Sequence, residues 1–317
     1  MEGRYFGVSE YFKKTYGEKW IKLSIDGGFT CPNRDGTLAT AGCAFCSESG
    51  SGEFSGVIRD GKRVEDPRSG VARIDISNQV ESQMALLHKK WGNRPAIAYF
   101  QSFTNTYKPL DALRILYNEA LACEGVEGLV IATRPDCISE AHCELFSKSK
   151  VMWVELGLQT IHDEKAAWMN RHYTYQNFID AYQLLSSHGI KCVVHLIAGL
   201  PGESRHDFLE SVRAVNALKP FGVKLHMLNI LEGTTLGEYF KAAPFDVLEQ
   251  TEYIEWICDA LERLSPEIVI HRLTGDGEKH RVIAPKWVFD KRSVLNGINK
   301  CLAARGTQQG TKITESY

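Results

Sequence analysis

The sequence predicts an α/β fold: a partial, TIM-like (β/α)6 barrel followed by a smaller, mostly helical C-terminal extension. Six short apolar segments alternate with helical patterns, which is typical of parallel strands joined by right-handed crossovers. Polar residues and glycines follow all six segments, as they do at the C-terminal rim of such barrels. A chain of 317 residues with 44% hydrophobic and 24% charged residues can bury a core of this size.

The chain divides into three predicted parts: a helical lead-in (1–19), the barrel (20–235) and an extension with a flexible tail (236–317). Residue periodicity predicts strands at 20–25, 96–100, 129–132, 151–158, 191–198 and 223–230. It predicts helices at 9–16, 77–91, 110–123, 139–147, 162–169, 175–187 and 204–217. Ser204 and Asp207 have the spacing of a capping box. The extension should contain helices at 235–241, 246–264 and 291–304, a β-like run at 267–273 and a frayed end from residue 306.

Nine cysteines are present, and three of them fall within sixteen residues as Cys31-x11-Cys43-x2-Cys46. The sequence shows no signal peptide or long apolar stretch, so we expect a cytoplasmic protein with reduced thiols and no membrane association. The three cysteines lie in a long, irregular segment (30–75) after the first strand, and no fourth cysteine lies within seventy residues. A structural zinc site needs four ligands, whereas three cysteines leave one iron of a four-iron cluster open. The other six cysteines are interpreted as packing residues.

The ends of the predicted strands collect residues that carry chemistry. Because parallel strands end at the same edge of a sheet, these segments should form one ligand-binding rim. The segments are Gln101–Tyr107, Thr133–Asp136, Glu155–Thr160, Gly199–Glu203 and His226–Asn229.

With these segments the sequence resembles the radical S-adenosylmethionine (radical SAM) superfamily. Phe45, directly before the third cysteine, matches the superfamily signature, whereas the wide first spacing departs from its commonest form. That spacing is similar to the branch of the Elongator catalytic subunit and the oxygen-independent coproporphyrinogen oxidases, and within it to the bacterial YtqA/YhcC-type family. The matching segments are Ser24–Gly36, Tyr99–Tyr107, Thr133–Asp136, Glu155–Thr160, Asn170–Thr174 and Gly199–Glu203.

The resemblance implies a radical SAM barrel with two cofactors, a [4Fe-4S] cluster and S-adenosylmethionine. Cys31, Cys43 and Cys46 would be the catalytic cluster ligands. Ser102 and Thr104 stand where the superfamily has a Gly-Gly-Glu segment that binds the amino group, so this sequence departs from the pattern there. The other implied cofactor contacts are Phe45 in the signature, Glu155 and Gln159 (ribose and methionine), Arg171 (carboxylate), and Ile197, Gly199 and Leu200 (adenine).

Three of these cofactor assignments have a plainer alternative. Arg171 could be a surface charge at a helix end, and Glu155 with Gln159 could form an internal polar pair. Gly199-Leu200-Pro201-Gly202 could be only a tight turn.

The implied chemistry is reductive cleavage of S-adenosylmethionine to a 5′-deoxyadenosyl radical that abstracts hydrogen from a substrate at the barrel mouth. His195 and Lys224 are further interior candidates, although His195 could equally be a core histidine. The residues expected to contact substrate are Asn105, Tyr107, Arg134, Asp136, His226 and Asn229.

The net charge of −2 excludes a strongly basic protein, but the charge is uneven. Residues 271–317 carry nine Lys or Arg and four acidic residues, a net charge of +5, which leaves −7 for the rest. Trp287 and Phe289 interleave with Lys286 and Lys291, a composition suited to RNA, or alternatively a solvated helix face with two core aromatics.

Three functions remain open from the sequence. The resemblance implies tRNA wobble-uridine modification, in which a 5-carboxymethylaminomethyl side chain matures towards aminomethyl, with an electron donor such as flavodoxin or ferredoxin. The second is a radical enzyme for a small metabolite, such as a tetrapyrrole or an amino-acid derivative. The third is a non-catalytic metal- or RNA-binding module.

Overall fold

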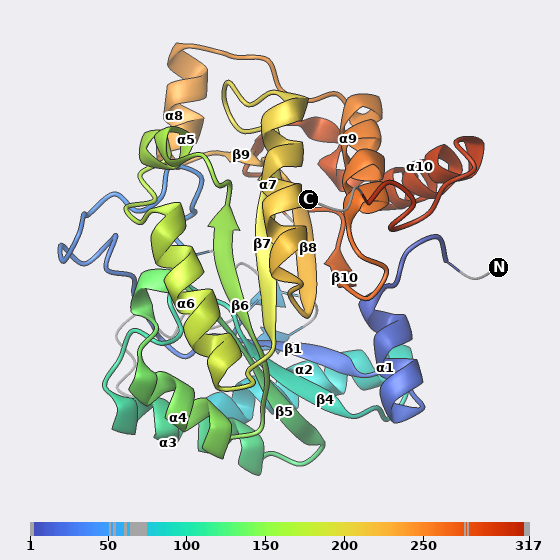
Figure 1. Ribbon diagram of the computed structural model, residues 1–317. Helices are drawn as coiled ribbons and strands as arrows, with labels where there is room; N and C mark the ends of the chain where they lie inside the picture. Colours follow the sequence, from blue (N-terminus) through green and yellow to red (C-terminus); the bar gives the residue numbers. More distant parts are fainter. Residues whose placement is uncertain are drawn as a thin grey trace.

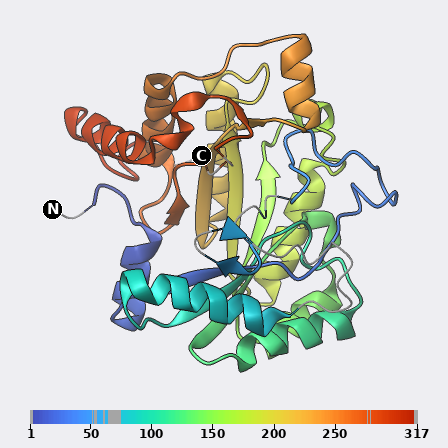
Figure 2. The ribbon, with the colours of Figure 1, turned by 180° about the vertical axis from the view of Figure 1, so that it is seen from behind.

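The computed structural model describes residues 3–50, 52, 55–59, 62–63, 75–275, 277 and 279–313. Its centre is a parallel seven-stranded sheet in the order β1-β4-β5-β6-β7-β8-β10, which curls into a half-barrel with helices on its outer side (Figures 1 and 2). The strands are β1 (Ile21–Ile25), β4 (Ala96–Phe100), β5 (Val126–Thr133), β6 (Val151–Gln159), β7 (Cys192–Ala198), β8 (Gly222–Met227) and β10 (Val269–Arg272). Two short antiparallel pairs are added: β2 (Ile58–Arg59) with β3 (Lys62–Arg63), and β9 (Ile230–Leu231) with β11 (Val282–Ala284). The partial α/β barrel predicted from the alternation is confirmed.

The helices follow the predicted alternation closely. Ser204 and Asp207 form the expected capping box, with each side chain accepting from the backbone N–H of the other. The helices are α1 (Val8–Tyr16), α2 (Ile76–Trp91), α3 (Leu110–Ala122), α4 (Glu140–Lys148), α5 (Asp163–Trp168), α6 (Tyr175–Ser187), α7 (Arg205–Leu218), α8 (Thr235–Ala242), α9 (Gln250–Arg263) and α10 (Lys291–Ala304), with 3-10 turns η1 (Pro135–Cys137) and η2 (Lys286–Phe289). Among the described residues, none of these helices combines the length and apolar character needed to cross a bilayer.

The seventh strand was expected to belong to the extension. β10 pairs in parallel with β8, with Val269 opposite Gly222 and Ile270 opposite Val223. The sequence therefore identified the β-like run but not its place in the main sheet, because strand pairing depends on long-range backbone hydrogen bonds.

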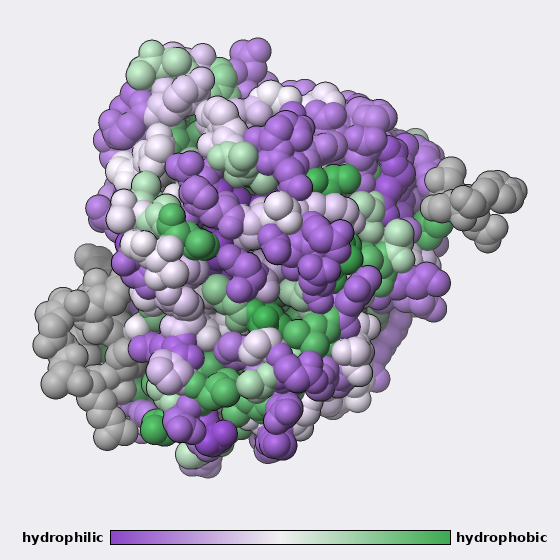
Figure 3. Space-filling view, turned by 60° about the vertical axis from the view of Figure 1, so that its left-hand side comes forward, coloured by the Kyte–Doolittle hydropathy of each residue, from purple (hydrophilic) through white to green (hydrophobic). Residues whose placement is uncertain are grey.

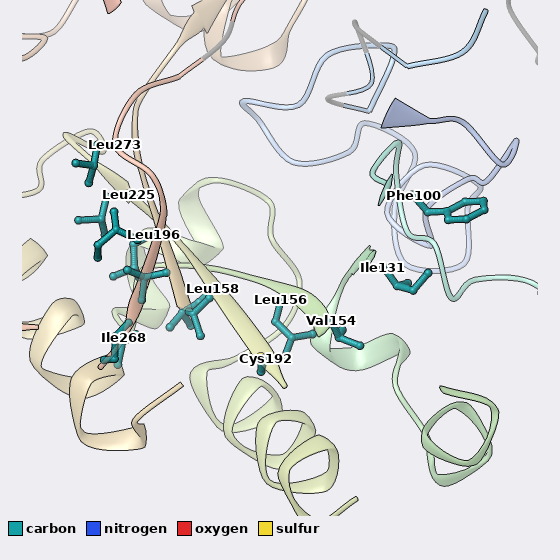
Figure 4. Packing of buried hydrophobic residues seen from close by; sticks show 14 of the residues in the cluster. Phe100, Ile131, Val154, Leu156, Leu158, Cys192, Leu196, Leu225, Ile268 and Leu273 are labelled. Atoms are coloured by element: carbon teal, nitrogen blue, oxygen red, sulfur yellow. The ribbon is translucent and has the colours of Figure 1, made fainter. Parts of the chain in front are cut away.

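The two faces of the sheet differ in burial. On the outer face Val154, Leu156 and Leu158 of β6 are fully buried and belong to one hydrophobic cluster with Leu196 and Leu225 of the next strands (Figure 4). The inner face alternates with them and is partly exposed, as in β1, where Lys22 and Ser24 are half-buried between buried neighbours. The outer face is thus the core, and the inner face carries the partly exposed side chains.

Helix α1 covers the N-terminal end of the strands with aromatic side chains. Phe12 stacks on Trp20, with ring centroids 5.3 Å apart, and lies 6.1 Å from the Trp153 ring. Tyr11 meets Phe221 edge to face at 4.9 Å. These contacts close the half-barrel at its base.

The chain after α10 corrects the prediction of a frayed end from residue 306. Gln309 is buried, accepts from the backbone N–H of Phe6 and donates to the carbonyls of Ser265 and Ile268. Residues 306–313 are therefore held against the body, whereas 314–317 lie outside the described residues. On the face in Figure 3 hydrophilic side chains dominate, and hydrophobic ones form small, separate patches.

Candidate active site

The three clustered cysteines lie in the cysteine loop (residues 26–50), which follows β1 at the C-terminal rim. All three are free and half-buried. A turn closed by the Cys46 N–H to Cys43 carbonyl bond, 2.9 Å long, holds the last two close together. Burial raises the pKa of the Cys43 thiol to about 12, and the nearby Cys46 and Cys31 add to the effect. The assignment of the three thiols to one cluster stays a prediction, and the structure places all three in the same loop.

The number of cysteines in the loop suits a cluster better than a structural zinc ion. In a [4Fe-4S] cluster each cysteine binds a different iron, so three cysteines leave the fourth iron open. A structural zinc site needs four ligands. Elsewhere in the described residues, His162, Asp207 and Glu210 bring metal-ligating atoms within 4.8 Å of one another.

Two residues that the sequence analysis did not single out brace the cysteine loop. The Asn33 amide donates to Cys43 Sγ at 3.5 Å and to the Asn170 carbonyl. Arg34 Nη2 donates to the carbonyls of Cys46 and Ser47 at 2.8 and 2.7 Å. Their place in the Cys-Pro-Asn-Arg segment beside the first cysteine was the available signal.

The segment after β4 packs directly on the cysteine loop. The Phe103 N–H donates to Gly50 carbonyl at 3.0 Å, and the Thr104 N–H donates to Thr30 carbonyl at 3.2 Å. Ser102 and Thr104 are both buried, and the Ser102 hydroxyl has no protein hydrogen-bond partner. A buried hydroxyl without a partner at this place fits a ligand atom bound beside the cysteines.

Glu155 lies deeper than its predicted contact with S-adenosylmethionine requires. It has no exposed surface, and its carboxylate accepts from Tyr99 Oη at 2.7 Å, His195 Nε2 at 2.8 Å and Trp153 Nε1 at 3.2 Å. Lys224 and Lys22 are its ion-pair partners. Burial opposes ionisation, but the two ammonium groups hold the Glu155 pKa well below its usual value. With every lone pair engaged, Glu155 fits an organising role on the inner face instead.

Arg171 is buried and uses its whole guanidinium on protein acceptors. Its N–H groups donate to the carbonyls of Leu158, Thr160 and Tyr173 and to the Asp163 carboxylate. This arrangement contradicts the helix-end surface charge, and it leaves no donor for the methionine carboxylate expected from the resemblance. The guanidinium fixes the end of β6, because five N–H donors match these clustered acceptors.

Gln159 lies at the end of β6 in the left-handed region, with φ of 63°. The single hydrogen of the Tyr173 hydroxyl is shared between the Gly157 carbonyl at 2.8 Å and the Gln159 side-chain oxygen at 3.1 Å. Asn170 and His172 also have positive φ, at 53° and 58°. Such strained backbone is common at ligand-binding sites, and Gln159 pairs with Tyr173 rather than with Glu155.

Arg134 and Asp136 form a bidentate pair after β5, with N···O distances of 2.9 and 2.7 Å. Arg134 also donates to Arg171 carbonyl at 3.1 Å. Burial raises the pKa of the neighbouring Cys137 to about 12, and Asp136, Arg134 and Cys31 all act on this thiol. Cys137 is thus near the cysteine loop, a proximity that the packing interpretation of this residue missed.

The predicted adenine-binding residues lie in one apolar cluster at the rim. Leu200 is buried there, and Phe45 and Ile197 pack against the same group. Gly199 has φ of 82°, and the Glu203 carboxylate accepts from Gly199 and Leu200 N–H at 2.9 and 3.2 Å. The segment is therefore a carboxylate-braced turn, and it carries an apolar surface beside the cysteines.

The expected substrate residues occupy different depths. Asn105 follows β4 and is buried, and its side-chain amide donates to the Ala132 carbonyl. Tyr107 Oη lies 2.8 Å from Thr37 Oγ1. His226 lies inside the half-barrel, with its ring centroid 5.4 Å from that of His195. Asn229 follows β8 near Gly275. His226 thus lies on the inner face of the sheet, whereas Arg134 lies near Cys43 and Tyr107 contacts the cysteine loop at Thr37.

Comparison with known proteins agrees with this geometry. Residues 31–215 match the radical SAM superfamily model, and residues 220–304 match the Radical_SAM C-terminal domain. YtqA of Bacillus subtilis (strain 168) is 38% identical over 312 residues, covering 98% of this chain and 92% of YtqA. A tRNA uridine(34) acetyltransferase of Methanocaldococcus jannaschii is 34% identical over 167 residues, covering 52% of this chain and 27% of that protein.

Structural comparison finds the same fold in the archaeal Methanocaldococcus infernus Elp3. The TM-score is 0.66 at 19% identity, covering 92% of this chain and 64% of that chain. The superfamily match spans more than half of the sequence and includes all three clustered cysteines. This chain therefore belongs to the radical SAM superfamily, and its cofactors are a [4Fe-4S] cluster and S-adenosylmethionine.

Proposed function

We propose that this radical SAM enzyme modifies tRNA at the wobble uridine, maturing the 5-carboxymethylaminomethyl side chain towards aminomethyl. The observation that carries the proposal is the 34% identity, over 52% of this chain, with a protein named as a tRNA uridine(34) acetyltransferase. The relative with the wider match, YtqA, shares this chain's length but has no stated activity. The part of the chain shared with the tRNA protein is thus the main support for an RNA substrate.

The inner face of the half-barrel suits a nucleotide that leaves its stack. Enzymes that react with a base take it out of the helix or loop into a pocket. Ile197 and His226 on the inner face are partly exposed, and Ile197 belongs to the apolar cluster that contains Phe45 of the cysteine loop. When bound, the two cofactors would supply hydrogen abstraction, and we propose the carboxymethyl carbon as its site. Loss of that hydrogen atom and of one further electron, with S-adenosylmethionine as the two-electron oxidant, would convert the amine to an imine. Hydrolysis of the imine would break the C–N bond, release glyoxylate and leave the aminomethyl group. The residues of the chain would orient the carboxymethyl carbon.

An electron must reach the cluster from another protein. We propose a flavodoxin or a ferredoxin as the donor, because these small carriers deliver single electrons at low potential. Reconstitution of turnover with purified flavodoxin, ferredoxin or a chemical reductant compares the three sources directly.

The first experiment tests the enzyme class. Anaerobic reconstitution should give about four irons per chain and 5′-deoxyadenosine with a reductant. Cys31→Ala should lose both the iron and the product, whereas Cys123→Ala, outside the cysteine loop, should keep them. A Cys31→Ala protein with unchanged function would favour the non-catalytic module, and about eight irons would bring the dispersed cysteines into a second cluster.

The second experiment tests the substrate. A deletion strain should accumulate carboxymethylaminomethyluridine at the wobble position of its tRNA, as measured by mass spectrometry of nucleosides. Purified enzyme should convert that tRNA in vitro. An unchanged nucleoside profile would refute the proposal, and turnover of metabolites without RNA would support the small-molecule alternative.

A further inference from the structure

The inward-facing side chains of the half-barrel form three layers along the strands. The lowest layer is apolar and includes Ile97, Val130, Trp153 and Val193, which pack with Phe12 of α1. Alternate residues one step further along the same strands form the middle layer, which is charged: Lys22, Tyr99, Glu155, His195 and Lys224. The top layer, nearest the cysteines, contains Gln159, Ile197 and His226. Because the base is closed by α1, a group that enters from the rim would end at the middle layer.

The middle layer has one carboxylate for two lysines. Glu155 Oε1 lies 3.5 Å from Lys22 Nζ, and Glu155 Oε2 contacts Lys224 Nζ. The Tyr99 ring lies 4.5 Å from one ammonium and 4.7 Å from the other, and its hydroxyl accepts from Lys224 at 3.1 Å. Glu155 also accepts hydrogen bonds from Tyr99, His195 and Trp153, so its lone pairs are fully used.

Positive charge therefore exceeds negative charge within this cluster. Lys224 is only 5% exposed, and a buried ammonium is costly unless it is paired. Burial lowers the pKa of Lys224 to about 7 despite Glu155, and Lys22 and Arg272 lower it further. Burial lowers the pKa of His195 to about 4, so this imidazole is neutral and donates Nε2–H to Glu155. A second anion at this layer would balance the second lysine.

The cluster is not sealed from solvent. The side chain of Lys22 is 31% exposed and that of His195 is 20% exposed, whereas Glu155 is fully buried. The exposed surface of the layer is thus cationic and neutral rather than acidic. This arrangement suits a small terminal anion better than a backbone phosphate, because the layer lies below the residues at the rim.

We propose that Lys22 and Lys224 form a subsite for the terminal carboxylate of the substrate side chain. The inference deepens the proposed function, because the carboxymethylaminomethyl group ends in such a carboxylate. Anchoring that end at the middle layer would hold the adjoining carbon between the subsite and the rim. Lys22 and Lys224 would then be specificity residues, while Glu155 positions them.

The test uses the reconstituted holoenzyme and two synthetic anticodon stem-loops, one with the carboxymethylaminomethyl side chain and one with its neutral carboxamide. For the wild-type enzyme, the KM of the stem-loop with the carboxylate should be at least about tenfold lower than the KM of the stem-loop with the carboxamide. This difference is expected for charge-assisted hydrogen bonds. Lys224→Met should remove that preference by raising only the KM of the acid. Lys191→Met, an exposed lysine at the start of β7, is the matched control and should keep it. If Lys224→Met does not fold, Lys22→Met provides the same test, because the Lys22 ammonium is less buried.

Two results would overturn the subsite. Equal KM values for both loops in the wild type would assign these cations to RNA phosphates or to the fold alone. If Lys22→Met and Lys224→Met lose the same activity on both stem-loops, the two lysines have a purely structural role.

A second measurement separates this inference from the proposed function. If the wild type converts neither loop, the wobble-uridine proposal fails, and saturation-transfer NMR with sarcosine and its amide then tests the subsite alone. Sarcosine should give a saturable signal that the amide lacks and that Lys22→Met and Lys224→Met reduce several-fold. The absence of a saturable signal in the wild type, or an unchanged signal in both variants, would refute the subsite.

Discussion

Arg171 donates all five of its N–H groups to acceptors of its own chain. The carbonyls of Leu158, Thr160 and Tyr173 are thereby satisfied at the end of β6, where Gln159 has a positive φ. Buried carbonyls that lose such a donor are costly. At the scale of a residue, the guanidinium is a brace for strained backbone next to the cysteine loop.

Substituting Arg171 tests this role. Arg171→Lys should lower the free energy of unfolding by roughly 3 kcal/mol, because one ammonium cannot serve three carbonyls and a buried ion pair. Denaturant unfolding under anaerobic conditions measures this loss, and Arg213→Lys on the exposed face of α7 is the control. A variant of unchanged stability that binds S-adenosylmethionine more weakly would instead establish the direct carboxylate contact.

The cysteine loop is positioned by backbone contacts with three other elements. Phe103 and Thr104 after β4 donate to Gly50 and Thr30, respectively. Ala44 donates to Met169 carbonyl at 2.8 Å and accepts from Leu236 N–H of α8 at 2.8 Å. At the scale of elements, the position of the three sulfurs depends on this docking as well as on the cysteines.

Gly50 is the point at which this docking can be tested. It has φ of 61°, and an added Cβ would lie 2.5 Å from the Phe103 ring. Gly50→Ala should therefore displace the loop and lower iron content and 5′-deoxyadenosine formation about tenfold. Gly189 has a similar φ of 67°, and an added Cβ there would meet no atom within 4 Å. Gly189→Ala is therefore the control, because it has the backbone strain without the steric clash. Equal iron content in both variants would show that the loop does not need this contact.

The charge asymmetry of the whole molecule is partly neutralised by folding. Arg305 pairs with Asp259 at 2.9 Å, and Lys312 pairs with the buried Glu262, both on α9. Arg292 and Lys300 remain exposed on one side of α10, two turns apart. Two exposed cations of the predicted basic extension thus lie on this helix.

These two cations predict the salt dependence of tRNA binding. Arg292→Ala with Lys300→Ala should weaken binding several-fold at low salt and reduce the slope of log K against log salt by about 2. Fluorescence anisotropy at several salt concentrations measures the slope. Lys14→Ala, an exposed lysine on α1, should leave it unchanged. An unaltered slope in the double variant would place the RNA elsewhere on the protein.

The sequence by itself determined the alternating strands and helices, the capping box at Ser204 and the cysteine trio. Each is a local pattern, and its period or spacing can be recognised in the sequence without knowing which segments it packs against. It also predicted the residues at the strand ends, because parallel topology brings those ends to one edge.

Only the tertiary structure decided which side chains meet. It placed β10 beside β8, turned Arg171 onto backbone carbonyls, brought Cys137 near Cys31, and joined Glu155 to two lysines on other strands. These contacts join residues far apart in the sequence, and strand register sets which alternate residues face inward. The physical reason is that burial and pairing, which set the role of a charged group, are properties of its surroundings rather than of its type.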